Sequence, residues 1–396
     1  MGELDRIVVV GASLAGLRSV ATLRAEGFSG SITVIGDEPE MPYDRPPLSK
    51  EVMRGEHGPA EVRLAGADEH GAVWRLGSPA VTLDPVGKVV VTADGVETPY
   101  DGAVLATGSG TRSLPSFDPA AQNVHSVRKL DDALRLSATL SAETKLLIVG
   151  CGFVGIEVAS SARSRGAQVT VVGLDPPVAP AGPLASAAAV RLLTEAGVRL
   201  HVGETVAEVE AAGSGYRVTL SGGAVVEADQ VVVAVGSTPN VGWLAGAGLE
   251  LGDGVECDET LRVAGVADVV AAGDIVRWPN PAFGGLVMRV EHWSNAVEQG
   301  VAAAKTLLAG AGATPFGSVP SFWSDHFGIR LQSVGLPRLA TRFEVVAGDP
   351  DEGVFCAAAY AGETLVGGVA YGMPRPLVMI KVKLAKAGVA LQPARS

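Results

Sequence analysis

Two stretches share one pattern and decide the fold: RIVVVGASLAGLRSVATLRAEG, residues 6–27, and KLLIVGCGFVGIEVASSARSRG, residues 145–166. Each has a short apolar strand, a glycine turn, a helix with apolar residues at helical spacing, and a closing glycine suited to a helix end. A second apolar strand follows each helix, SITVIG in the first case and QVTVVG in the second. This pattern predicts the opening β-α-β unit of a dinucleotide-binding fold, present twice.

The first glycine turn is G-x-S-x-x-G, running from Gly11 through Ser13 to Gly16. Backbone N–H groups in such a turn can approach a pyrophosphate at the helix N-terminus, where the helix dipole favours anions. Asp37 and Glu38 follow the second strand, where a carboxylate would accept hydrogen bonds from an adenosine ribose. A helix start without any ligand would give the same pattern.

The second glycine turn is a complete G-x-G-x-x-G, and it stands in the right strand–turn–helix context. Its strand ends on Gly173, where a ribose-binding acid is expected, and the nearest acid is Asp175. The choice between NADH and NADPH therefore stays open, with NADH favoured. The residues predicted to contact this nucleotide are Gly150, Gly152, Phe153, Val154, Gly155, Glu157 and Gly236.

The order of segments predicts an α/β fold with two Rossmann-like dinucleotide-binding domains and a small α+β C-terminal domain. A β-rich stretch, with AVTLDPVGKVVVTADG as a hairpin, separates the two similar units, and the strands QVVVAVG and VVAAGDIVRW follow the second. We predict an outer domain, residues 1–112 and 240–318, split by an inserted domain, residues 113–239. Alternating strands and a final helix predict the last domain, residues 319–396.

Composition restricts the class of protein. The net charge of −12 argues against nucleic acid as a partner, and no apolar run reaches the roughly 18 residues of a membrane span. The acidic start does not resemble a signal peptide. Three widely separated cysteines without a C-x-x-C make disulfides and a cysteine metal site unexpected, and they favour a reducing cytoplasm.

Two nucleotide folds in one chain suggest two nucleotides, and a flavin with a nicotinamide is the pairing that makes chemical sense. Asp274, in AGDI, lies at the carboxyl end of an apolar strand, where it could accept hydrogen bonds from ribityl hydroxyls. Aspartate at this position would equally suit a helix N-cap.

Several motifs together carry a family resemblance: PYDRPPLSK, LATGS, GCGFVGIEVA, VGSTPN, AAGDI, RVEHWSNAVEQG and FWSDHFG, in this order. Across nearly its whole length the chain resembles the FAD-dependent pyridine-nucleotide ferredoxin reductases of bacterial oxygenase systems. The resemblance implies a glutathione-reductase-like architecture, with FAD in the outer domain and NAD(P)H in the inserted one. It also implies hydride transfer from nicotinamide to flavin N5, then single electrons passed to a ferredoxin.

The resemblance gives Lys50 a role beside the flavin as a catalytic residue paired with Glu157. On sequence alone, Lys50 would be a surface lysine. The prolines around it would stiffen the loop, and a preorganised cation would stabilise charge on the reduced flavin. Matching positions imply FAD contacts at Gly11, Ser13, Ala15, Gly16, Asp37, Arg45, Lys50, Val81, Thr107, Gly108, Arg128, Asp274, Trp293 and Trp323.

The missing C-x-x-C favours direct electron exit from the flavin to an external carrier, because disulfide-using relatives need a redox cysteine pair. The family's carrier is a small acidic ferredoxin with a [2Fe–2S] or [3Fe–4S] cluster. Residues 316–396 carry eight basic against six acidic residues. Candidates for steering such a partner are Arg330, Arg338, Arg342, Arg375, Lys381, Lys383 and Lys386. An NAD(P)H oxidase or quinone reductase, and an NADH-responsive flavoprotein switch, are the alternative hypotheses.

Overall fold

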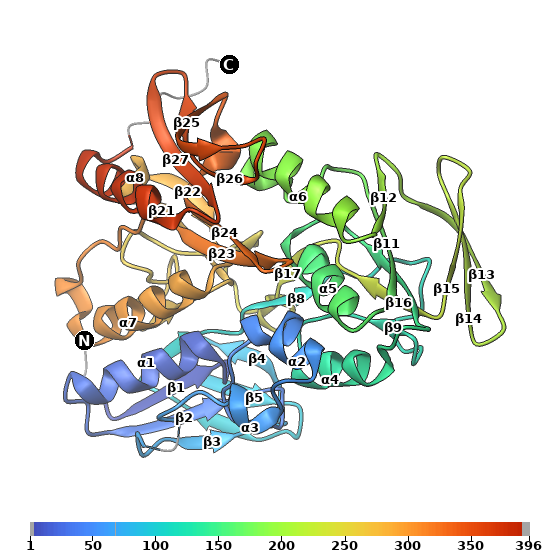
Figure 1. Cartoon of the computed structure of the whole chain (residues 1–396). Helices are drawn as coiled ribbons and strands as arrows, with labels where there is room; N and C mark the ends of the chain where they lie inside the picture. The colour runs from blue at the N-terminus through green and yellow to red at the C-terminus, as the bar shows by residue number, and fades with distance from the viewer. Residues whose placement is uncertain (1–3, 68, 390–396) are drawn as a thin grey trace.

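A computed structural model of the protein describes residues 4–67 and 69–389. In Figure 1 the blue N-terminal part lies at the lower left, the green middle part at the right, and the red C-terminal part at the top. The predicted α/β class, with two dinucleotide-binding units and a C-terminal α+β unit, is confirmed by the sheets described below. The predicted domain boundaries stay a prediction, and their residues 1–3 and 390–396 lie outside the described residues.

The first glycine turn follows the central strand of a parallel sheet. Its strands run in the order β20 (Val269–Ala271), β7 (Gly102–Leu105), β1 (Arg6–Val10), β2 (Ser31–Ile35) and β3 (Val73–Arg75). Helix α1 (Leu14–Ala25) connects β1 to β2, and α7 (Trp293–Ala309) packs along α1. Strand β20 thus returns to the sheet of β1 from far along the chain.

Short elements complete this first unit. The predicted hairpin is confirmed as β4 (Ala80–Asp84) paired with β5 (Val89–Thr92), and β6 (Glu97–Pro99) extends it. The helical segments of the proline-rich loop and its continuation are η1 (Pro46–Ser49), α2 (Glu51–Arg54) and α3 (Pro59–Val62). A further small sheet contains β18 (Leu251–Gly252), β19 (Gly254–Glu256), β21 (Val276–Asn280) and β22 (Leu286–Arg289), with η3 (Gly242–Leu244), η4 (Pro281–Phe283) and η5 (Gly310–Gly312) nearby in the chain.

The second unit repeats the arrangement of the first. Its parallel sheet runs β12 (Arg199–Val202), β11 (Gln168–Gly173), β10 (Lys145–Val149), β16 (Gln230–Val233) and β9 (Val124–His125). The helical segments are α4 (Leu130–Thr139), α5 (Phe153–Ser164), η2 (Ala179–Ala181) and α6 (Pro183–Glu195). A projecting antiparallel sheet contains β13 (Val206–Ala212), β14 (Gly215–Leu220) and β15 (Val225–Ala228), and β8 (Ser109–Thr111) pairs with β17 (Ser237–Pro239) where the chain crosses between units.

The C-terminal unit is an antiparallel sheet with one helix. Its strands run β23 (Ser321–His326), β24 (Ile329–Gly335), β27 (Thr364–Tyr371), β26 (Val354–Ala361) and β25 (Arg342–Asp349), with η6 (Pro337–Leu339) between β24 and β25 in the chain. Helix α8 (Pro374–Ala387) packs on β27, β24 and β26, while α5 packs against β23.

The inner strands β26 and β27 of this C-terminal sheet are buried on both faces, because successive side chains of a strand point to opposite sides. Cys356 and Ala358 belong to one hydrophobic core together with residues of α8 and the first unit, whereas Phe355 and Ala357 belong to the core formed with α5. The sheet therefore fixes the C-terminal unit against both nucleotide units.

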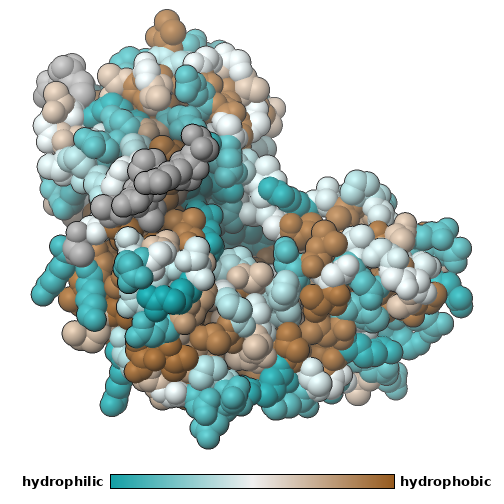
Figure 2. Space-filling model, turned by 90° about the horizontal axis from the view of Figure 1, so that it is seen from above, coloured by the Kyte–Doolittle hydropathy of each residue, from teal (hydrophilic) through white to brown (hydrophobic). Residues whose placement is uncertain are grey.

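The surface is mixed in character. On the face seen in Figure 2, hydrophobic residues gather in separate patches among hydrophilic ones. Over residues 4–67 and 69–389, no helix has the length and apolar character needed to cross a membrane.

Candidate functional site

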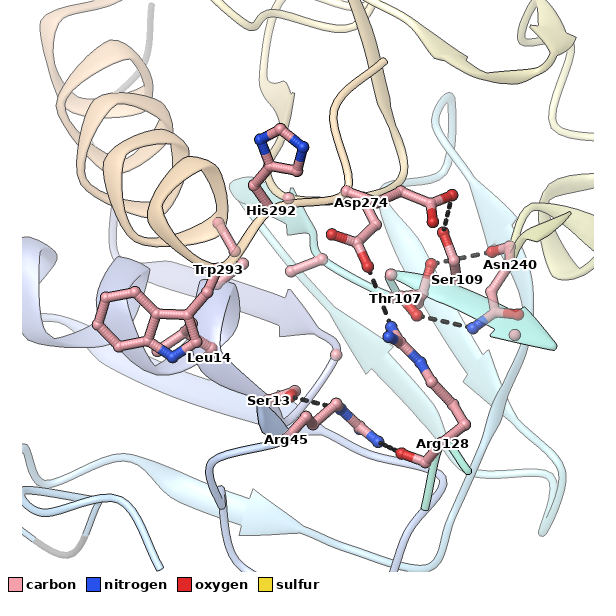
Figure 3. A pocket seen from close by; sticks show the side chains of 18 of the residues that line it. Ser13, Leu14, Arg45, Thr107, Ser109, Arg128, Asn240, Asp274, His292 and Trp293 are labelled. Carbon is pink, nitrogen blue, oxygen red and sulfur yellow. Dashed lines mark hydrogen bonds and ion pairs between the residues drawn. The ribbon is translucent and has the colours of Figure 1, made fainter. Parts of the chain in front are cut away.

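A cavity of about 990 Å³ lies where the first sheet, helix α5 and the C-terminal sheet meet. Figure 3 shows part of its lining, with side chains from all along the chain facing the same space. The predicted residues that line it are Gly11, Ser13, Ala15, Asp37, Arg45, Lys50, Thr107, Gly108, Arg128, Phe153, Val154, Glu157, Asp274, Trp293 and Trp323. The predicted residues that the structure leaves outside the lining are Gly16, Val81, Gly150, Gly152, Gly155 and Gly236.

Val81, predicted to contact FAD through its backbone alone, does not line the cavity, whereas its neighbours Pro79 and Ala80 do. The residue lies in β4 and is 46% exposed. Its side chain is on the surface because β4 belongs to a small antiparallel sheet with a solvent-facing side.

The first glycine turn can take only glycine at its start. Gly11 has φ +121°, and a Cβ there would lie 2.1 Å from the carbonyl oxygen of Ala106. Ser13 caps α1 in an extended conformation, and its hydroxyl makes no cap bond to the helix; it accepts a 3.4 Å hydrogen bond from Arg45 Nε. The hydroxyl and the first N–H groups of α1 therefore border the cavity.

The acidic pair after β2 makes contacts across the cavity edge. Asp37 forms a 2.9 Å ion pair with Lys129, and Glu38 forms a 2.6 Å ion pair with Arg45. The hydroxyl of Tyr43 also donates to Glu38. Arg45 in turn donates to the backbone oxygen of Arg128 at 2.6 Å, so the proline-rich loop is fastened to the second unit.

Lys50 and Glu157 form the buried ion pair that the resemblance implied. Lys50 Nζ lies 2.7 Å from Glu157 Oε2, and each residue is 6% exposed. Ser49 donates to the same carboxylate oxygen at 2.5 Å, and Lys50 also donates to the backbone oxygen of Pro46 at 3.1 Å. The loop that precedes Lys50 is held by prolines and by the hydrogen bond from Ser161 to the Ser49 carbonyl.

A second ion pair faces the cavity from the other side. Arg128 lies 3.0 Å from Asp274 Oδ2. Burial raises the pKa of the Asp274 carboxyl above its usual range, and the Arg128 guanidinium opposes that rise. Asn240 and Thr107 exchange two hydrogen bonds of 2.9 Å beside this pair (Figure 3). These bonds join the two segments of the chain that connect the first unit to the second. Asn240 belongs to the VGSTPN motif, yet nothing in its spacing indicated this role.

Aromatic side chains close the cavity toward the C-terminal unit. The rings of Trp293 and Trp323 meet edge to face at 6.1 Å, and Trp293 Nε1 donates to Asp44 at 2.7 Å. Phe153, at the start of α5, meets Phe322 of β23 at 4.6 Å. Because α5 follows the second glycine turn, the second nucleotide unit opens onto the same cavity as the first.

The hydrogen bonds of the two glycine turns show which residues around Gly173 correspond to those of the first unit. Gly11 N donates to Ile35 O, and Gly150 N donates to Val172 O, so Gly173 corresponds to Gly36. A Cβ on Gly173 would lie 2.5 Å from Cys151 Sγ, which explains why the position holds no acid.

The acids Asp37 and Glu38 therefore correspond to Leu174 and Asp175. Leu174 is 68% exposed. Burial, assisted by the nearby Asp175 carboxylate, raises the pKa of the Cys151 thiol to about 11. Asp175 thus lies close to Cys151 in the second glycine turn, and it occupies the position in the second unit that Glu38 occupies in the first.

The cavity has charged side chains in its lining, which suit a polar ligand, and three of its lining residues also carry a buried polar atom without a partner. In the part of the chain that the structure describes, His292 Nδ1, Trp243 Nε1 and Arg289 Nε have no hydrogen-bond partner, and all three residues line the cavity. Burial lowers the pKa of His292 to about 4, so its ring is neutral at pH 7. Clusters of His, Cys, Asp or Glu able to hold a metal ion were found nowhere in the described residues.

Comparison with known proteins gives the family. The family described as pyridine nucleotide-disulphide oxidoreductase matches residues 5–300, and the one described as reductase C-terminal matches residues 321–396. The chain belongs to the pyridine nucleotide-disulphide oxidoreductase family. The predicted family resemblance is thereby confirmed, and membership brings FAD and NAD(H) as its cofactors.

Similar members of this family share most of the chain. Rhodocoxin reductase of Rhodococcus erythropolis is 36% identical over 375 residues, 93% of this chain and 87% of that protein. The ferredoxin–NAD(+) reductase component of the p-cumate 2,3-dioxygenase system of Pseudomonas putida is 34% identical, with 96% and 94% covered. The crystal structure of the covalent putidaredoxin reductase–putidaredoxin complex has a TM-score of 0.91 at 28% identity, with 96% and 93% covered.

The family name refers to a disulfide, but the described residues, 4–67 and 69–389, contain none. Cys151, Cys257 and Cys356 are free and buried. Burial raises the pKa of each thiol, to about 11 for Cys356, so all three stay protonated and unreactive at pH 7.

Proposed function

We propose that this protein is an NADH-dependent ferredoxin reductase that passes electrons through FAD to an acidic iron–sulfur ferredoxin of a P450 or other oxygenase system. The observation that carries the proposal is the buried Lys50–Glu157 pair, which faces a cavity shared by both nucleotide units and lies away from any reactive thiol. The named relatives serve oxygenase and ferredoxin systems, which supports the same assignment.

FAD would be held by the first unit. The backbone at Gly11 and the N-terminus of α1 suit its pyrophosphate, with Ser13 and Arg45 beside it. Glu38 and Asp37 suit the adenosine ribose. Arg128 and Asp274 face the middle of the cavity, where the ribityl chain and pyrophosphate would run. Residues Ala15, Gly16, Thr107, Gly108 and Val81, the last through its backbone, complete the proposed FAD contacts.

When bound, FAD accepts an electron pair from NADH and releases single electrons to the carrier. Lys50 supplies a fixed cation at the cavity wall, where it would stabilise negative charge on the ring. Glu157 holds that cation in place and limits its field. Trp293 and Trp323 exclude water from the C-terminal side of the site.

NADH would bind the second unit with its nicotinamide near Phe153 and Val154. Gly150, Gly152, Gly155 and Gly236 would lie along its pyrophosphate. Asp175 stands in the register of the FAD-side ribose acid, so we propose that it accepts the adenosine ribose hydroxyls of NADH and repels the 2′-phosphate of NADPH.

The ferredoxin would dock on the C-terminal side, near Trp323. Of the basic candidates, Arg330 is paired with Asp325 and Arg342 with Glu344, so these two contribute little net steering charge. Arg338 lines the cavity, whereas Lys383 lies on α8. The three free cysteines also suit a reducing cytoplasm, which we propose as the location of this protein.

The test is NADH-dependent reduction of cytochrome c mediated by a [2Fe–2S] ferredoxin, with a [3Fe–4S] ferredoxin assayed in parallel. We expect reduction that saturates with ferredoxin and stops when ferredoxin is omitted. Equal rates with and without ferredoxin would instead favour an oxidase or quinone reductase.

A further inference from the structure

A chain of buried hydrogen bonds continues from Glu157 into the C-terminal unit, behind the cavity wall. Ser324 Oγ lies 2.5 Å from Glu157 Oε1, on the carboxylate oxygen that Lys50 does not contact. His326 Nε2 lies 2.9 Å from Ser324 Oγ, and His326 Nδ1 meets the hydroxyl of Tyr371. These three residues, Ser324, His326 and Tyr371, form the relay described below.

Every member of the relay is shielded from water. Ser324, His326 and Tyr371 are each 0% exposed, and none of them lines the cavity. Alternation along β23 places Ser324 and His326 on the same face, toward α5. In the register of the sheet, Ser324 pairs with Leu331 of β24, which pairs with Tyr371 of β27. The relay therefore runs across the sheet and joins three distant segments of the chain.

The direction of each hydrogen bond follows from charge and burial. Burial, assisted by the nearby Lys50 cation, lowers the pKa of His326 to about 3, while Asp325 opposes this weakly. A neutral imidazole has one donor and one acceptor. Ser324 donates to the Glu157 carboxylate, which has no proton to give, so Ser324 accepts from His326 Nε2–H. His326 Nδ1 then accepts from the Tyr371 hydroxyl.

Two further contacts hold the strand end in place. Phe327 N donates to Ser160 Oγ of α5 at 2.8 Å, at a residue with φ +50°. Ser161, next on α5, donates to the carbonyl of Ser49 at 2.7 Å. Adjacent residues of α5 thus fasten both the loop that carries Lys50 and the hairpin that carries the relay.

We propose that Ser324, His326 and Tyr371 are positioning residues that fix the orientation and effective charge of Glu157, and so set how strongly Lys50 acts on the flavin. This inference rests on the proposed function of the Lys50–Glu157 pair. Each donor on a carboxylate disperses its charge. When the Ser324 donor is lost, Glu157 offsets Lys50 more fully, and reduced flavin is stabilised less.

The test measures the FAD midpoint potential of the holoenzyme by anaerobic dye titration. Ser324→Ala should lower the potential by about 30 mV, a tenfold change in the two-electron equilibrium constant. Tyr371→Phe should lower the potential by a smaller amount, since the Tyr371 hydroxyl reaches Glu157 only through three hydrogen bonds in series. Matched controls are Ser333→Ala and Tyr100→Phe, which remove buried hydroxyls that have no partner within the described residues. The controls should leave the potential unchanged.

A second measurement uses the wild-type holoenzyme and does not depend on how a variant folds. Nitrogen-15 NMR of the histidine side chains, with His326 assigned by its loss in His326→Asn, should show a neutral ring protonated on Nε2 from pH 6 to 9. A ring protonated on Nδ1, or one that titrates in this range, would overturn the relay. Wild-type potentials in both Ser324→Ala and Tyr371→Phe would also overturn it.

These outcomes separate the relay from the proposed function. Potentials that shift as expected in a protein unable to reduce any ferredoxin would support the relay and refute the reductase. Unchanged potentials in an active ferredoxin reductase would refute the relay alone.

Discussion

Replacing Lys50 by methionine should destabilise the protein far more than the same change at Lys129. The two lysines have nearly equal ion-pair distances, 2.7 Å from Lys50 to Glu157 and 2.9 Å from Lys129 to Asp37. Their surroundings differ: the side chains are 8% and 7% exposed in the first pair, and 50% and 58% exposed in the second. Burial, and not distance, therefore decides the expected difference.

The magnitude follows from what each substitution leaves behind. Lys50→Met leaves a buried carboxylate without its cation, a change that costs about 3–5 kcal/mol in buried pairs. Because Ser49 and Ser324 still donate to Glu157, we expect the lower end, about 3 kcal/mol. Lys129→Met leaves a solvated carboxylate and should cost about 0–1 kcal/mol.

The assay is urea unfolding at saturating FAD, followed by far-UV circular dichroism, with the first transition compared among variants. The Lys50→Met/Glu157→Leu double variant is the decisive control, because removing both charges should recover much of the lost stability. If Lys50→Met unfolds at the same urea concentration as Lys129→Met, or the double variant is less stable than both singles, the reasoning is wrong.

Four other predictions follow from the site. Burial lowers the pKa of His292 to about 4 and that of His326 to about 3, below the value of about 6.5 in the unfolded chain. The unfolded chain therefore takes up these protons first, and the free energy of unfolding should fall as the pH drops from about 6.5 toward 4 and 3. Unfolding titrations between pH 3 and 8 check this. Burial raises the pKa of Asp274, so the folded FAD-free protein loses stability as the pH rises through that pKa and the carboxylate becomes charged. Asp274→Asn should therefore raise the melting temperature of the FAD-free protein at pH 7 and weaken FAD binding, both measured by calorimetry. Asp175→Asn should raise kcat/KM for NADPH relative to NADH by about tenfold, a difference of about 1.4 kcal/mol, in steady-state assays. Lys383→Glu should raise the KM for ferredoxin at low salt, with the difference fading at high salt and no change in ferricyanide reduction.

Local sequence patterns were sufficient to predict the two nucleotide units and the C-terminal sheet. Strand, glycine turn and helix are encoded within about 25 residues, so both nucleotide units could be predicted from spacing alone. The C-terminal sheet was predicted from the successive short strands FEVVAG, GVFCAAAY and TLVGGVAYG, because each apolar run can be recognised within the strand itself.

The contacts within the site could not be predicted from local sequence patterns, because they join segments far apart in the chain. Lys50 and Glu157 lie in different units, and only the family resemblance placed them together. The correspondence of Gly173 with Gly36, and of Asp175 with Glu38, could not be predicted from the sequence because the register between the two units is visible only in the sheets. The Ser324–His326–Tyr371 relay was missed because buried strand residues two apart look like ordinary core positions.

The most direct test of the central claim is anaerobic stopped-flow absorbance of the FAD-bound protein, first with NADH and then with a [2Fe–2S] ferredoxin. We predict rapid flavin bleaching by NADH, followed by flavin reoxidation as the ferredoxin is reduced. Flavin that bleaches only over minutes, or that stays reduced when ferredoxin is added, would contradict a ferredoxin reductase.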